Sequence, residues 1–335
     1  MAGPIIQEIR FQNYKALRDT TLPLERLTIL IGPNGSGKST ALEGIGLPDL
    51  NLKTLTVGLP EAGQLDTAIL ARAVDGGTLG RRMARDRAGA WKSRDIKTAG
   101  TEGPRQANRC YSVLQNLAIY SLDAPAIAKP VALEPDMRLG PKGEKLAGVL
   151  DGLRDEHPER FEALNEELGR WIPEFDRVLF ATPQGGHRAI QLRRRREQKP
   201  IPAADVSQGT LLALAILTLA YLPDPPPIIG LEEPGRGIHP RLLRDVRDAI
   251  YRLVYPERFG EDREPVQVVC TTHSPYFLDL FRDEPESIVI ANKTEDNVQF
   301  TRLMDLPNIE EILGQTPPLG ELWYSGVLGG VPAGK

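Results

Sequence analysis

The chain has 335 residues, with 41 Lys and Arg against 45 Asp and Glu, which gives a formal net charge of −4. This balance does not indicate nucleic-acid binding driven by the net charge of the chain, although it allows local basic patches. Two cysteines, Cys110 and Cys270, match no metal spacing, and we expect them to be reduced thiols in a cytoplasmic protein.

The apolar segments bear on membrane association. The first ten residues contain neither a basic leader nor a continuous apolar stretch, so we expect no signal peptide. The longest nearly apolar run, residues 211–222, is shorter than the roughly 20 residues that a helix needs to span a bilayer. We therefore expect no membrane partner.

The N-terminal part begins with predicted strands and continues into a segment without a regular period. Residues 5–11 mostly alternate between apolar and polar side chains, a turn is indicated near Asn13, and residues 27–31 read as a buried strand. Tyr14, at that turn, either packs against the core or stacks on a bound adenine. Prolines, glycines and charges mix from about 48 to 115, which predicts a loop-rich insertion.

Helices predominate in the middle of the chain. Apolar residues recur at helical spacing at 146–153 and at 161–171, and Pro158 stands where a first helical turn tolerates proline. A strand is predicted at 189–193, and a strongly apolar helix at 210–221. Two more buried strands, at 228–231 and 266–270, and a hairpin across 287–303 complete the pattern.

A glycine-rich loop follows the first buried strand. Residues 32–39 fit the phosphate-loop pattern Gly-x-x-x-x-Gly-Lys-Ser, and they stand between a strand and a helix, as the motif requires. Its glycines let backbone N–H groups face the phosphates, Lys38 supplies a cation, and the Ser39 hydroxyl is placed to bind Mg²⁺. The residues expected to bind the nucleotide here are Gly32, Pro33, Asn34, Gly35, Ser36, Gly37, Lys38, Ser39 and Thr40.

Polar residues that can support phosphate chemistry follow the two later strands. Glu232 and Glu233 are adjacent, and strand alternation points neighbouring side chains apart, so we expect different roles for them. Glu232, with Ser39, would steady the Mg²⁺ shell, and Glu233 would polarise the attacking water. His273 can donate to a γ-phosphate or orient that water.

A short motif precedes the apolar helix at 210–221. Ser207 can cap this helix, and Gly209 keeps the backbone at its start open. The start of the helix is therefore either a capped end without a ligand or an anion site.

Taken in order, these motifs resemble those of ABC-type ATPases of the RecF/SMC/OLD class, an AAA-family group that includes the AbiEii-toxin-like AAA domain. The stretches that carry the resemblance are 32–40, 206–210, 232–234 with 237–240, 272–275 and 319–323. The resemblance implies an α/β fold, an ABC-type P-loop NTPase head with a RecA-like core sheet, N-terminal antiparallel strands and an inserted helical signature lobe. The implied boundaries are 1–50 and 223–305 for the nucleotide-binding core, 51–115 for the insertion, 116–222 for the helical lobe and 306–335 for the tail.

The resemblance also implies roles for single residues. Glu233 matches the catalytic glutamate and His273 the switch histidine, acting with Lys38. Ser207 and Gly209 would contact the γ-phosphate bound by a second copy. Glu232 departs from the aspartate that most ABC proteins carry. The glutamine of the Q-loop has three candidates, Gln64, Gln106 and Gln115.

By this resemblance the chain is a cytoplasmic, ATP-hydrolysing homodimeric switch. ATP would join two copies, and hydrolysis would release them. The cycle would gate DNA engagement or a separate effector subunit, a nuclease or toxin, in antiphage defence or DNA repair. Two alternatives stay open, a scaffold that binds ATP without hydrolysing it and the ATPase subunit of a transporter.

Two basic segments stand outside these motifs. Residues 81–97 hold seven basic and two acidic residues around Trp91, which favours either nucleic-acid contact with base stacking or a solvated, partner-binding surface. Four successive arginines at 193–196 lie on a predicted strand, where we expect an exposed edge.

Overall fold

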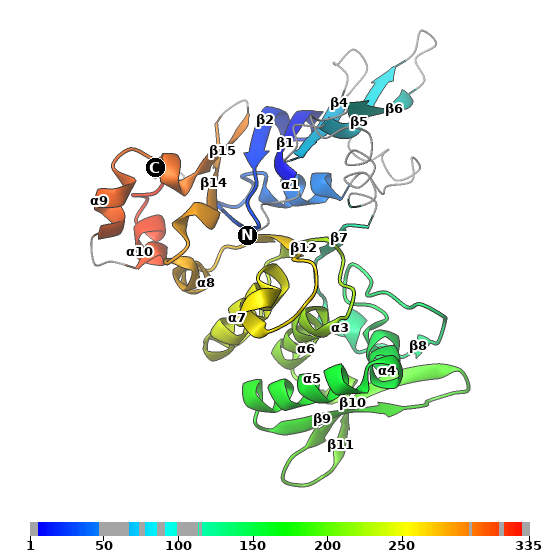
Figure 1. Ribbon diagram of the computed structural model, residues 1–335. Coiled ribbons are helices and arrows are strands. Elements are labelled where there is room, and N and C mark those ends of the chain that lie inside the picture. Colours follow the sequence, from blue (N-terminus) through cyan, green and yellow to red (C-terminus); the bar gives the residue numbers. More distant parts are fainter. Residues whose placement is uncertain are drawn as a thin grey trace. The chain divides into compact units, whose positions relative to one another are not determined.

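Figure 1 shows the computed structural model of the chain. The structure describes residues 6–46, 67–73, 78–85, 91–98, 113, 116–294, 297–314 and 318–329, with backbone alone for the strands between 67 and 98. The chain forms two compact units. Unit 1 comprises Met1–Ile119, Pro226–Gly230 and Val266–Lys335, and unit 2 comprises Tyr120–Pro225 and Leu231–Pro265.

A six-stranded sheet forms the core of unit 1. Its order is β15 (Val298–Arg302), β14 (Ile288–Lys293), β3 (Leu27–Ile31), β13 (Gln267–Thr271), β12 (Ile228–Glu232) and β7 (Ala118–Tyr120), and the boundary with unit 2 falls within β12 and β7. β13 and β14 pair with β3 in parallel, and β15 pairs with β14 antiparallel. Every residue of β3 and β13 is buried, which accounts for their nearly continuous apolar sequences. The strands and the hairpin predicted in these regions are confirmed.

A second sheet of unit 1 is antiparallel. Its order is β2 (Leu17–Pro23), β1 (Ile6–Tyr14), β4 (Thr67–Ala73), β5 (Thr78–Arg85) and β6 (Trp91–Thr98). The predicted N-terminal antiparallel strands are confirmed, and the chain turns between them at Lys15, whose φ is 51°. The expectation of loops throughout 48–115 missed β4, β5 and β6. Backbone pairing with neighbours holds these strands although their sequences do not sustain an alternating pattern.

The hairpin of β1 and β2 shares an apolar core with α1 (Lys38–Ile45). Phe11, Leu17 and Leu42 are each at most 2% exposed. Tyr14 is 3% exposed, and its ring stacks on Phe11 with 6.2 Å between the ring centroids. Tyr14 therefore packs against the core, which decides between the two interpretations of this residue.

Short elements complete unit 1 on the C-terminal side. The helices are α8 (Pro275–Leu278), α9 (Ile309–Gly314) and α10 (Leu319–Tyr324), and single 3-10 turns lie at Asp279–Phe281, Pro285–Ser287 and Leu303–Asp305. Cys270, in β13, is a free and fully buried thiol, and its burial raises the thiol pKa. Cys110 lies outside the described residues.

Unit 2 is mainly helical. Its helices are α3 (Ala124–Ile127), α4 (Leu146–Glu156), α5 (Pro158–Trp171), α6 (Gln208–Tyr221) and α7 (Leu243–Val254), with 3-10 turns at Ala203–Asp205, Pro240–Leu242 and Pro256–Phe259. Its strand β10 (His187–Arg194) pairs antiparallel with β8 (Val131–Ala132), β9 (Phe175–Ala181) and β11 (Pro200–Pro202). The helices and the strand predicted for the middle of the chain are confirmed. In the parts of the chain that the structure describes, no helix combines the length and apolarity needed to cross a membrane.

The arginine run at 193–196 does not form the sheet edge that we expected, although Arg195 and Arg196, beyond the end of β10, are exposed. Arg193 lies in β10 opposite both Arg177 of β9 and Pro200 of β11, so the strand is paired on both sides there. Its guanidinium donates two hydrogen bonds to Asp176, at 2.9 and 3.2 Å, and these lower the pKa of the Asp176 carboxyl. The chain returns along β10 as β11 after a short turn, a pairing that the charge pattern does not reveal.

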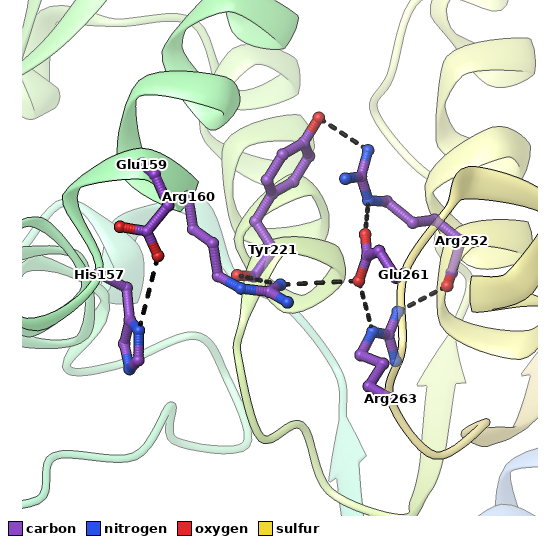
Figure 2. A network of polar contacts seen from close by, with 7 residues as sticks. All are labelled: His157, Glu159, Arg160, Tyr221, Arg252, Glu261 and Arg263. Atoms are coloured by element: carbon purple, nitrogen blue, oxygen red, sulfur yellow. Dashed lines mark hydrogen bonds and ion pairs between the residues drawn. The ribbon is translucent and has the colours of Figure 1, made fainter.

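A partly buried carboxylate, Glu261, ties several parts of unit 2 together (Figure 2). It forms ion pairs with Arg252 and, at 2.7 Å, with Arg263, and Arg160 of α5 approaches it at 3.6 Å. Arg252 also donates to the Tyr221 hydroxyl at the end of α6, at 3.0 Å. Burial alone would raise the pKa of the Glu261 carboxyl, but the hydrogen bonds and charges of Arg263 and Arg252 outweigh it and lower that pKa.

We expect Glu261→Gln to lower the free energy of unfolding by about 2 to 3 kcal/mol at pH 7, because it leaves the largely covered guanidinium of Arg263 without its counter-charge. Since the folded-state pKa of Glu261 is lowered, its contribution is present above the ordinary pKa of glutamate and is lost as pH falls through the folded-state value. Urea unfolding of both proteins at pH 7 and pH 3 measures this difference, which should shrink in acid. The control Glu162→Gln removes an exposed ion pair with Arg177 and should cost less than about 1 kcal/mol. Equal stability of wild type and Glu261→Gln at pH 7 would contradict the argument.

Candidate nucleotide site

The predicted phosphate loop joins β3 to α1 in unit 1. Gly37 is the residue before α1, with φ 88°, and Gly32, directly after β3, has φ 149°. L side chains rarely adopt these conformations. A Cβ on Gly37 would also lie 3.1 Å from side-chain atoms of Leu17 and Val298, and one on Gly32 would collide with the Ala291 carbonyl. The loop therefore depends on glycine at both ends.

Lys38 is folded back over this loop. Its side chain is buried, with the residue 4% exposed. Its ammonium donates to the carbonyls of Gly32, at 2.8 Å, and Pro33, at 2.9 Å, and lies 3.4 Å from the Ser36 hydroxyl. Phosphate oxygens are charged acceptors and bind an ammonium more strongly than neutral carbonyls do. The loop is therefore suited to bind phosphate groups beside the buried ammonium of Lys38.

His273 meets the same loop from β13. The N–H of Thr272 donates to the Leu30 carbonyl at 3.1 Å, which continues the pairing of β13 with β3 to the edge of the phosphate loop. Partial burial and then the charge of Lys38 lower the pKa of the His273 imidazole, while a hydrogen bond with the Gly32 backbone acts in the opposite direction. These influences favour the neutral imidazole, which has one N–H to donate.

The two acidic residues lie at the end of β12 and are half-buried. Glu233 has φ 50°, a left-handed conformation that costs a non-glycine residue on the order of 1 kcal/mol. Its carbonyl accepts the Arg236 N–H at 2.8 Å, which closes a turn directly after the strand. Glu232 and Glu233 line a small pocket of unit 2 together with Leu212 of α6. Backbone strain of this kind is concentrated at functional positions, where the surrounding structure supports it.

The motif at 206–210 forms the start of α6, also in unit 2. Ser207 caps the helix by accepting the Thr210 N–H at 3.3 Å, and its hydroxyl lies 2.8 Å from that of Thr210. Ser207 remains exposed. A Cβ on Gly209 would lie 2.7 Å from the Gly237 carbonyl oxygen, so the start of α6 touches the loop that follows Glu233. Capping and anion binding both remain compatible with this geometry.

The predicted site residues fall into two groups. Residues 32–40 and His273 belong to unit 1, whereas Ser207, Gly209, Glu232 and Glu233 belong to unit 2. Among the residues that the structure describes, no three His, Cys, Asp or Glu side chains gather as a metal site. Mg²⁺ beside a nucleotide uses few protein ligands, because waters and phosphates complete its shell. The assignment of Ser39 and Glu232 as protein ligands stays a prediction from the sequence.

Some predicted residues lie beyond what the structure describes. Gln64, Gln106, Gln115 and Arg87 are outside the described residues, and the other basic residues at 81–97 belong to β5 and β6, which are described as backbone alone. Conversely, no sequence pattern indicated a role for Thr272 and Gly237, which lie in the turns beside His273 and Gly209. Thr272 follows a buried strand and is 1% exposed, a signal that singles it out only once the strand pairing is known.

Two family models match the chain. An AAA ATPase domain matches residues 5–47, which include the phosphate loop. The family described as "AAA domain, putative AbiEii toxin, Type IV TA system" matches residues 130–279, which include Ser207, Glu233 and His273.

One known protein is similar to this chain in sequence over a short stretch, and one solved structure is similar to it in fold. The OLD nuclease of Thermus scotoductus is 42% identical over 43 residues, which are 13% of this chain and 8% of that protein. The SMC head domain from Thermotoga maritima shares 12% identity at a TM-score of 0.47, covering 89% of this chain and 98% of that one. Both family models describe AAA domains, and together with the order of the motifs and the short match to the OLD nuclease they support an ABC/AAA-type ATPase of the RecF/SMC/OLD class.

Proposed function

We propose that this chain binds ATP with Mg²⁺ and hydrolyses the ATP as a switch that joins and releases two copies. The observation that carries the proposal lies in unit 1. Lys38, buried in a glycine-dependent loop, and His273, more than 200 residues later, converge on the Gly32 backbone. A cation and a neutral N–H donor on one phosphate-sized loop suit a triphosphate.

In this proposal the phosphates lie in residues 32–39, with Lys38 transferring its hydrogen bonds from carbonyls to phosphate oxygens. Ser39 and Glu232 would hold Mg²⁺, which would neutralise charge on the phosphates. The Glu233 carboxylate orients a water and accepts its proton as the water oxygen bonds to the γ-phosphorus and the bond to the leaving oxygen breaks. His273 donates its N–H to the γ-phosphate, and the lowering of its pKa by partial burial and Lys38 favours the neutral form, which adds no second cation.

A second copy would complete each site. Ser207 is exposed at a helix start, where the positive end of the dipole faces outward. We propose that Ser207 and Gly209 contact the γ-phosphate held by the partner copy. The exposed hydroxyl supports this assignment, since capping uses only part of its hydrogen-bonding capacity.

The output of the switch follows from the same proposal. We propose that the joined and released states gate DNA engagement or a separate nuclease or toxin subunit in the cytoplasm, in antiphage defence or DNA repair. The family and relative named above, a putative toxin family and a nuclease, support this choice. The match with the nuclease spans 8% of its length, so its activity is not assigned to this chain.

We expect Glu233→Gln to slow phosphate release at least about 100-fold, because an amide cannot accept the water proton. ATP binding should survive, and the dimer should persist in ATP because hydrolysis no longer dissolves it. Phosphate release and light scattering on a sizing column measure the two effects. The control Glu166→Gln changes an exposed acid of α5 and should match wild type. Equal phosphate release by wild type and Glu233→Gln would instead favour a scaffold that does not use hydrolysis.

Mixing two inactive variants tests whether the sites are shared. Lys38→Ala disables a chain's own phosphate loop, and Ser207→Arg disables the surface that it offers to its partner. A mixed dimer contains one site with an intact loop and an intact Ser207, so mixing should restore ATPase activity.

The matched control mixes Lys38→Ala with His273→Ala. Both changes affect the loop of their own chain, so every site in the mixed dimer is damaged and no recovery is expected. Absence of recovery in the first mixture at all ratios would rule out sites shared between copies.

A further inference from the structure

The C-terminal helix α10 packs against α8, the short helix that begins two residues after His273 (Figure 1). Both helices belong to unit 1. Leu319 and Leu322 of α10 are buried, as are Phe277 of α8 and Phe281 just beyond it, whose rings contact edge to face at 5.1 Å. The two elements therefore share a packed interior and do not merely touch at the surface.

Two contacts join α10 to the segment after His273. Gly320 lies against Pro275, the first residue of α8, so closely that a Cβ would be 2.5 Å from the Pro275 carbonyl oxygen and 2.7 Å from its Cβ. The Gly320 N–H donates to the Asp279 carboxylate at 2.7 Å. One residue of α10 therefore contacts both the start of α8 and the residue that follows its end.

His273 lies between this segment and the sheet. On one side, the Thr272 N–H is bound to Leu30, and the Thr272 hydroxyl accepts the Ser274 N–H at 3.0 Å. On the other side, Ser274 caps α8 by accepting the Phe277 N–H at 3.2 Å. His273 is thus a single residue between the hydrogen-bonded end of β13 and the start of α8, which packs against Gly320.

We propose that Gly320 and Asp279 are positioning residues for His273. They fix the position of the first turn of α8. The position of that turn determines where the His273 imidazole lies relative to Lys38 and Gly32. This inference rests on the proposed function only for its effect on hydrolysis, because the placement of the imidazole can be measured without turnover.

The variant Gly320→Ala tests the proposal. The added methyl group must displace Pro275 backbone atoms, so we expect kcat for ATP to fall about 10- to 100-fold, as small misplacements of catalytic groups do. The Kd for ATP, set mainly by the phosphate loop, should change by less than about twofold. The matched control is Gly314→Ala at the end of α9, where a Cβ meets no atom within 4 Å. It should behave as wild type in both measurements.

Titration of His273 by NMR gives a readout that loss of stability alone would not move. In the wild type, partial burial and Lys38 keep the imidazole pKa below its ordinary value. In folded Gly320→Ala, the displaced ring should titrate closer to that ordinary value, whereas Gly314→Ala should not change it. His273→Ala identifies the resonance.

A second pair of variants decides the matter if Gly320→Ala does not fold. Asp279→Ala removes the acceptor for the Gly320 N–H and should shift both kcat and the His273 titration in the same direction. Asp279→Asn keeps a carbonyl oxygen there and should restore most of both values. Wild-type kcat and titration in folded Gly320→Ala, or in Asp279→Ala, would overturn the proposal. If His273→Ala leaves kcat unchanged while the titration still shifts in Gly320→Ala, the role of His273 in hydrolysis fails and its positioning stands.

Discussion

The parallel pairing of β13 with β3 is the constraint on which the site in unit 1 depends. Its register sets Cys270 opposite Ile29 and Thr271 opposite Leu30, and the Thr272 N–H extends it to the last residues before the phosphate loop. A slip of one residue would turn every side chain of β13 to the other face of the sheet. Because both strands are buried on both faces, such a slip would disrupt the packing on each face and would remove His273 from Gly32. Burial of apolar side chains thus fixes a polar contact between residues more than 200 positions apart.

Next to that pairing, the phosphate loop holds Lys38 as a cation and favours a neutral His273. Carbonyl oxygens surround the Lys38 ammonium, and the same cation helps to keep His273 neutral. A protonated imidazole would place two cations within one loop, whereas the neutral form offers a hydrogen-bond donor without that repulsion. The arrangement suits an anionic ligand, because the ligand can replace the carbonyls at Lys38 while His273 contributes its N–H.

Local signals predicted the parts of the fold whose cause is local. The apolar runs at 27–31 and 266–270 predicted buried strands, and the glycine spacing predicted the loop, because each pattern is complete within a few residues. The strands β4 to β6 escaped prediction, because their partners are other strands and their sequences carry no clear alternation. The contact of Gly320 with Pro275 is equally invisible in the sequence, since nothing in either residue type specifies the other across 45 positions. Arg193 shows the opposite error, in which a charge run suggested a sheet edge although β10 is paired on both sides there.

In unit 2, the contact of Gly209 with the Gly237 carbonyl is a similar constraint, because it holds two predicted motifs together. Ser207 stands two residues before this contact, and Glu233 stands four residues before its other side, in a strained turn that the Arg236 N–H closes. With so little chain between them, a displacement of the start of α6 reaches the turn of Glu233 through direct steric contact. In the proposed dimer, Ser207 serves the partner's nucleotide while Glu233 serves its own. The glycine at 209 then matters to both sites, because any side chain there would push apart the two motifs that share this contact.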